Sequence, residues 1–135
     1  MKRFTLMVVI MFAMLFGAMV ERAFAQDRDR GVDDAVFLLE SSAHTVDFEQ
    51  RADSEIQIFV MTACTLFRGV IPNANSSINE RDCERLFNLV KHINYAVNEL
   101  KLRKQLTNKE YQQMMEAIRM MYEQGTKAYE RGLRR

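Results

Sequence analysis

The chain has 135 residues, a formal net charge of +1 and two cysteines. A chain of this length holds one domain with one hydrophobic core. Residues 26–135 carry 16 basic and 17 acidic side chains, a net charge of −1. This balance argues against a general nucleic-acid-binding protein, which would carry a basic excess.

The first 25 residues have the layout of a secretory signal. Lys2 and Arg3 precede an uncharged apolar run over 4–20, and the small-residue pattern Ala23-Phe24-Ala25 stands where a signal peptidase would cut. An uncleaved membrane anchor is the alternative, although an apolar run of this length is at the short end for spanning a bilayer. We therefore expect a signal peptide over 1–25 and a secreted, extracellular domain over 26–135 that has no membrane contact after cleavage.

Hydrophobic periodicity predicts an all-α fold of about four helices. The first helix begins near Val32, where apolar residues recur at helical spacing, and ends within 41–45. The second runs over about 47–68 and is stopped by Gly69 and Pro72, because glycine accepts a helix cap and proline cannot continue a helix. Residues 71–77 form the clearest predicted loop.

Two capping boxes mark the remaining helices. Ser77 with Glu80 predicts the start of the third helix, and Thr107 with Glu110 predicts the start of the fourth. The third helix has an apolar seam with steps of three and four residues, and the fourth has a stripe from Tyr111 onward. Short connections make neighbouring helices antiparallel, so the predicted fold is a small antiparallel helical bundle.

The two cysteines, Cys64 and Cys83, are expected to form one disulfide. In an exported protein a pair of cysteines is typical of a disulfide, and two buried free thiols are the alternative. Cys64 lies five residues before Gly69 and Cys83 lies six residues after Ser77, so antiparallel helices would place the two side by side. A Cys-x-x-Cys redox motif is absent, which favours a structural bridge.

No sequence motif for catalysis, cofactor binding or a metal site stands out. The histidines His44 and His92 fit no zinc-binding spacing, and neither a nucleophile elbow nor a phosphate-binding glycine loop is present in the sequence. We therefore expect no catalytic residues, no metal and no cofactor, and we interpret the chain as a protein other than an enzyme. Asn75 with Ser77 forms a glycosylation sequon in the predicted loop.

The charge changes sign along the chain. Residues 26–60 have a net charge of −6, whereas residues 101–135 have a net charge of +5. One interpretation is internal complementarity, in which the first two helices lean on the last. The other is a surface for an acidic partner, formed by basic residues near the last connection and at the C-terminus. The candidate partner-binding residues are Lys101, Arg103, Lys104, Lys109, Lys127, Arg131, Arg134 and Arg135.

Aromatic and methionine side chains at helical spacing leave a further alternative open. They would either pack an ordinary core, which we favour, or line a pocket for a small hydrophobic ligand, since methionine adapts to irregular shapes. The residues concerned are Phe59, Phe67, Phe87, Tyr111, Met114, Met115, Met121 and Tyr122.

The general plan resembles the anophensin/albicin family of mosquito salivary proteins. The shared features are a signal ending in Ala23-Phe24-Ala25, a mature chain of this size, a helical pattern over 32–133 and few cysteines. The resemblance implies a secreted inhibitor that binds a host plasma protein and blocks the alternative complement pathway or contact activation. The alternatives are an extracellular carrier of a hydrophobic ligand and a bacterial periplasmic chaperone or assembly factor.

Overall fold

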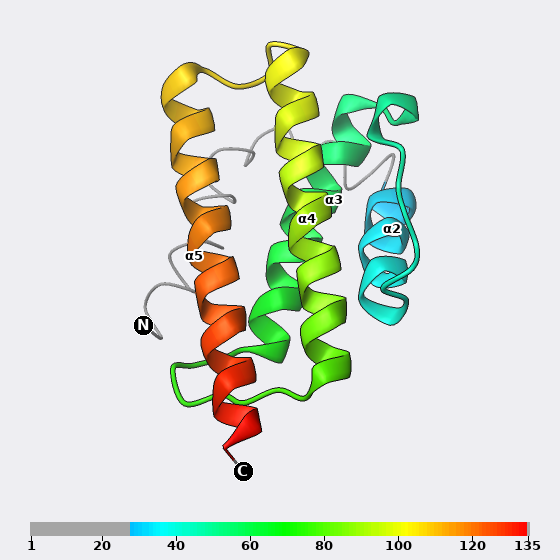
Figure 1. The fold of residues 1–135 in the computed structure, drawn as a ribbon. Helices are drawn as coiled ribbons and strands as arrows, with labels where there is room; N and C mark the ends of the chain where they lie inside the picture. The colour runs from blue at the N-terminus through cyan, green and yellow to red at the C-terminus, as the bar shows by residue number, and fades with distance from the viewer. Residues whose placement is uncertain (1–27, 135) are drawn as a thin grey trace.

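The computed structural model describes residues 28–134, and within them every regular element is helical. Three long helices, α3 (Asp53–Val70), α4 (Glu80–Leu102) and α5 (Asn108–Leu133), run alternately down, up and down (Figure 1). A shorter helix, α2 (Arg28–Glu40), packs against α3 and α4 on the side away from α5. The prediction of an all-α bundle with four helices is confirmed.

Helix α2 differs from the prediction in its bounds and in its direction relative to α3. It begins at Arg28, four residues earlier than expected, and ends at Glu40. Helices α2 and α3 run in the same direction, because residues 41–50 return along the length of α2 before α3 begins (Figure 1). We call this returning segment, 41–50, the strap. It ends in a single 3₁₀ turn, η1 (Phe48–Gln50).

The predicted second helix is interrupted at Arg51 and Ala52. Both residues have extended backbone angles, and Asp47 caps η1 by accepting a hydrogen bond from the Glu49 N–H at 3.1 Å. Phe48, with 5% of its surface exposed, turns into the core beside Phe59. The uniform helix expected over 47–68 was therefore wrong in its first turn.

Of the two predicted capping boxes, the structure confirms the one at the start of α5 but not the one at the start of α4. The Thr107–Glu110 capping box is confirmed: the Glu110 N–H donates to the Thr107 hydroxyl at 3.1 Å, and the Glu110 carboxylate accepts from the Thr107 N–H at 2.8 Å. The Ser77 cap was wrong, because Asn79 takes that position and accepts a hydrogen bond from the Asp82 N–H at 2.8 Å. The loop between α3 and α4 therefore extends over 71–79.

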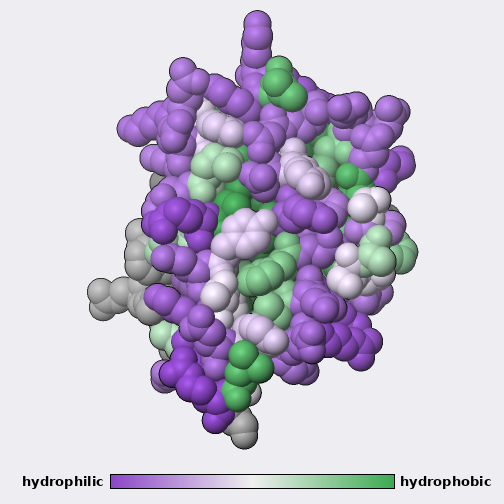
Figure 2. All heavy atoms as spheres, in the orientation of Figure 1, coloured by the Kyte–Doolittle hydropathy of each residue, from purple (hydrophilic) through white to green (hydrophobic). Residues whose placement is uncertain are grey.

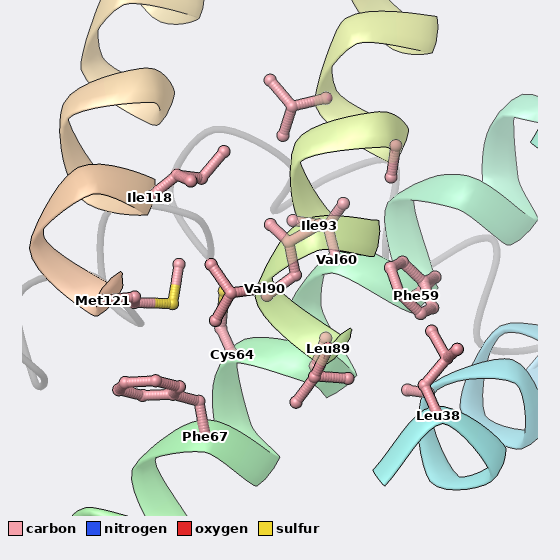
Figure 3. Close-up of a cluster of buried hydrophobic side chains, with 14 of the residues drawn as sticks. Leu38, Phe59, Val60, Cys64, Phe67, Leu89, Val90, Ile93, Ile118 and Met121 are labelled. Atoms are coloured by element: carbon pink, nitrogen blue, oxygen red, sulfur yellow. The ribbon is translucent and has the colours of Figure 1, made fainter. Parts of the chain in front are cut away.

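The core fills the space between the long helices and α2. Figure 3 shows Leu38, Phe59 and Leu89 meeting on one side of the core, with Phe67 and Met121 on the other. Met114 and Met121 are almost fully buried, as are Phe59 and Phe67. These four side chains therefore pack the core, as the favoured interpretation of the aromatic and methionine pattern expected.

The predicted disulfide between Cys64 and Cys83 is wrong, because both are buried free thiols. The later helix start at Glu80 places Cys83 only three residues into α4, whereas Cys64 lies six residues before the end of α3. At about 1.5 Å per residue, this leaves the two cysteines at different heights along the bundle. The interpretation of the chain as exported therefore rests on its N-terminal sequence alone.

The predicted signal peptide, residues 1–25, lies outside the described residues. Between Arg28 and Arg134, no helix has the length and apolar character needed to cross a membrane.

Candidate functional site

The predicted basic residues divide between the two ends of α5. Lys101, Lys104 and Lys109 surround the connection between α4 and α5, whereas Lys127, Arg131 and Arg134 lie in the last turns of the chain. Helix α5 has 26 residues and so a length of about 39 Å, which separates the two groups. Arg135 lies outside the described residues. The structure therefore presents two basic groups rather than one patch.

Arg103 is held inside the fold. Its guanidinium donates to the carbonyl oxygens of Phe48 at 2.9 Å and Arg51 at 2.7 Å, and to the Asp53 carboxylate at 2.8 Å. It also pairs with Glu99 at 3.0 Å. The hydrogen bond with the Asp53 carboxylate is the main cause of a raised pKa of Arg103. Partial burial acts in the opposite direction, and Glu99 raises the pKa further. Arg103 therefore fastens the strap and the start of α3 to α4. Because its guanidinium is engaged by these internal partners, it is not a free cation for a binding partner.

Arg131 is also engaged internally, whereas most of the predicted lysines are free. The Arg131 guanidinium donates to the Ser76 carbonyl at 2.6 Å and ties the loop over 71–79 to α5. Lys104, Lys109 and Lys127 are exposed and, among the described residues, form no ion pair. Lys101 lies over the Tyr111 ring, 5.8 Å from its centroid, and donates to Asn108.

The ion pairs support internal complementarity between the acidic N-terminal region and the basic C-terminal region only in part. Arg51 pairs with Asp34 at 3.0 Å and Arg30 with Glu55 at 3.3 Å, both within the acidic N-terminal region. Among the described residues, the Arg103–Asp53 pair is the one that joins the acidic region to the basic C-terminal region. In the described part of the chain, internal complementarity therefore rests on the single cation Arg103. Arg131 binds the Ser76 carbonyl, and Lys104, Lys109 and Lys127 face solvent.

Asn75 lies exposed in a turn of the loop between α3 and α4. Its N–H donates to the Asn73 side chain at 2.8 Å, and the Ser76 hydroxyl accepts from the Asn73 N–H at 3.2 Å. Asn79 is the N-cap residue of α4, so Ser77 of the sequon does not occupy the capping position. The sequon is accessible in geometry, and glycosylation of Asn75 stays a prediction.

The least expected feature is a strip of aromatic side chains along the seam between α4 and α5. All four tyrosines of the chain belong to these two helices. Tyr111, Tyr122 and Tyr129 are spaced by 11 and 7 residues, which places them on one face of α5. We define the aromatic strip as Phe87, Tyr95, Tyr111, Met115, Tyr122 and Tyr129. All but Tyr95 are partly buried against the core, whereas Tyr95 is 49% exposed and lies on the strap side of α4, beside His92.

Contacts across the seam hold the strip in place. Phe87 meets Tyr122 edge to face, with ring centroids 5.8 Å apart. The Tyr111 hydroxyl donates to the Asn98 side chain at 2.6 Å. Burial, with a smaller contribution from Tyr95, raises the pKa of Tyr122, so its hydroxyl stays protonated at neutral pH.

Gly125 has a packing role that the sequence did not reveal. A Cβ atom at this position would lie 2.8 Å from Cε1 of Phe87. The absence of a side chain therefore lets the Phe87 ring lie directly on α5. Glycine is less favourable than alanine in a helix by about 1 kcal/mol, and the close approach of the Phe87 ring offsets this cost.

Two shallow grooves flank the exposed row of α4. The first has a volume of about 450 Å³ and is lined by Phe87, Tyr122 and Lys91 on the helices and by Ser42 of the strap. The second, of about 260 Å³, lies between Tyr95 and Leu102 on α4 and Val46 and Glu49 of the strap. Figure 2 shows apolar and weakly polar side chains gathered along the middle of this face, with hydrophilic side chains on both sides. The strap thus forms one wall of each groove.

No cluster of three or more histidine, cysteine or acidic side chains between Arg28 and Arg134 is placed to hold a metal ion. Burial raises the pKa of both Cys64 and Cys83, with Glu84 and Glu80 adding to the effect at Cys83. Both cysteines are therefore protonated thiols at neutral pH and poor nucleophiles.

Sequence reasoning considered Phe87, Tyr111, Met115 and Tyr122 for a ligand pocket, but it included neither Tyr95 nor Tyr129. The available signal was the restriction of tyrosine to the last two helices, at spacings that fall on one helix face. Comparison of the chain with protein-family models, with curated proteins and with solved structures gives no match.

Proposed function

We propose that this chain is a secreted binding protein that occupies the surface of an extracellular protein partner. The observation that carries the proposal is the aromatic strip, which gathers every tyrosine of the chain on one face. Tyrosine is enriched at protein interfaces because it offers a large apolar area, a polar tip and a small loss of conformational entropy.

The lysines around the aromatic strip indicate which kind of partner surface would fit it. Lys91 borders the groove beside Phe87 and Tyr122, and Lys104 and Lys109 lie at the connection between α4 and α5. All three are exposed and form no ion pair with a described carboxylate. A partner surface with an apolar centre and an acidic edge would complement this arrangement, and the lysines would speed its association. The resemblance to the anophensin/albicin family supports a host plasma protein of the complement alternative pathway or of contact activation as that partner.

The experiment uses protein produced in a secreting host. Intact mass should show that residues 1–25 have been removed. The secreted protein should then inhibit either alternative-pathway haemolysis or contact-activated clotting. Substituting Tyr95→Ala should weaken that inhibition by about thirtyfold, the effect of losing a central aromatic contact worth about 2 kcal/mol.

Matched variants separate the strip from the rest of the surface. Phe37→Ala removes an aromatic side chain of similar exposure, 53%, from α2, together with its contact to His44 of the strap. With strap amide protection unchanged, this variant should leave inhibition intact. The triple substitution Lys91→Glu, Lys104→Glu and Lys109→Glu should slow association, whereas Lys127→Glu at the other end of α5 should not. Arg103 is excluded from the reversal because it is part of the fold. Absence of inhibition in both assays, or equal inhibition by the Tyr95 and Phe37 variants, would contradict the proposal.

A further inference from the structure

Both histidines of the chain lie where the strap meets α4. His92 is 1% exposed, and its Nδ1–H donates to the Asn88 carbonyl at 2.8 Å. Its ring packs between Phe48 of the strap, at a centroid distance of 6.4 Å, and Tyr95 of the aromatic strip, at 5.4 Å. His92 is therefore the side chain that separates the end of the strap from the exposed face of Tyr95.

The turn of α4 that precedes His92 holds the strap by hydrogen bonds. The Asn88 side chain donates to the carbonyl oxygens of Ser41 at 3.5 Å and His44 at 3.2 Å. His44 itself is exposed and packs against Phe37 of α2, with centroids 5.5 Å apart. Apart from Val46 and Phe48, the residues of the strap are exposed, and the Arg103 guanidinium binds the Phe48 and Glu49 carbonyls at one end of the strap. Along the rest of the strap, therefore, few contacts keep it closed.

The charges near His92 do not favour a cation there. Burial lowers the pKa of His92, and Lys91 and His44 lower it further, whereas the hydrogen bond with Asn88 acts in the opposite direction. The carboxylates of the strap do not stabilise a protonated His92, because Asp47 caps η1 and Glu49 is exposed. On the neighbouring elements, Glu99 and Asp53 are engaged by Arg103, Asp34 by Arg51, and Glu55 by Arg30. Among the described residues, His92 forms no ion pair.

We propose that His92 is a proton-sensitive latch, which holds the strap on α4 when neutral and releases it when protonated. Release would remove one wall of each groove beside the aromatic strip and uncover the buried side of Tyr95. The binding surface would thus be complete at neutral pH and lost in mildly acidic surroundings. This consequence for binding rests on the proposed function, but the release of the strap does not.

The direction of the pH effect follows from proton linkage. A histidine whose pKa is lower in the closed state than its ordinary value of 6.5 binds fewer protons closed than open. The closed state therefore has its full stability above that ordinary value and loses it as the pH falls. Between the two pKa values the equilibrium shifts toward opening by up to about tenfold per pH unit.

Backbone amide exchange of the strap, followed from pH 7.5 downward and corrected for intrinsic rates, tests the latch directly. The reporting amides are those of His44, Gln50 and Arg51, each of which donates a hydrogen bond to a carbonyl oxygen of the strap. Their protection should fall by about tenfold per pH unit below about 6.5, while amides of α5 stay protected. His92→Gln, which is neutral at all pH values, should abolish the fall, and His44→Gln should leave it unchanged.

A titration of the two imidazole rings by nuclear magnetic resonance keeps the test decisive if a variant fails to fold. The protonation midpoint of His92 should lie below the ordinary histidine value of 6.5 and coincide with the loss of strap protection. An identical fall in the His92→Gln protein, or protonation of His92 with the strap still protected, would overturn the latch. If the strap opens as expected but no partner is inhibited at any pH, the proposed function fails and the latch stands.

Discussion

The two flanks of α4 are held by different kinds of interaction. On the α5 side, Phe87 and Tyr122 pack as rings, with Gly125 making room for them. On the strap side, the contacts are mostly hydrogen bonds from single side chains, above all from Asn88 and Arg103. Apolar packing is distributed over many atoms and tolerates the loss of a few, whereas directional bonds to one guanidinium or one amide fail together.

The largest expected effect is at Arg103, on the strap side. Arg103→Met removes the donor to the Phe48 and Arg51 carbonyls and leaves Asp53 unpaired, so we expect the free energy of unfolding to fall by about 3 kcal/mol. Urea denaturation followed by circular dichroism measures it. Arg119→Met is the matched control, because Arg119 is exposed and its ion pairs within the described part of the chain are with Glu116 and Glu123 of its own helix. A loss no larger than in the Arg119 variant would show that Arg103 does not fasten the strap.

A smaller effect is expected at Gly125, on the α5 side. Gly125→Val would force the Phe87 ring away from α5, so we expect a loss of about 2 kcal/mol in urea denaturation. Adding Phe87→Leu removes the ring edge that causes the overlap, and the double variant should recover part of that loss. Additive losses in the double-mutant cycle would mean that Gly125 and Phe87 are not coupled across the seam.

The smallest expected effect is a gain, at the end of α4 that both flanks share. Lys104 has a φ of 61°, and the Gln105 N–H donates to the Leu100 carbonyl at 2.9 Å, which together form a Schellman cap. Glycine is favoured at this left-handed position, so Lys104→Gly should raise the thermal midpoint by an amount equivalent to about 1 kcal/mol. A lower midpoint would indicate that the lysine side chain contributes more than its backbone costs.

Interactions that are local in sequence were predictable, and those that depend on distant residues were not. The Thr107 cap lies three residues from its partner Glu110, and the α4 seam repeats within one helix, so both were visible in the sequence. The break at Arg51 could not be foreseen, because Arg103, which binds the Arg51 carbonyl, lies 52 residues further on.

The errors at the cysteines and in the candidate site have the same origin. Ser77 and Asn79 are both acceptable caps, and choosing the wrong one moved Cys83 along its helix relative to Cys64. The basic residues were grouped by sequence position, whereas the fold separates them and uses Arg103 and Arg131 internally. Exposure of Tyr95 depends on where the strap ends, which hydrophobic periodicity does not specify.

The distribution of tyrosine gives this protein a built-in optical probe. Because tryptophan is absent and all four tyrosines lie on α4 and α5, near-ultraviolet absorption and intrinsic emission originate almost entirely from one face of the molecule. A change in these spectra on mixing with another macromolecule would report directly on that face, without a label and with little background from the rest of the chain.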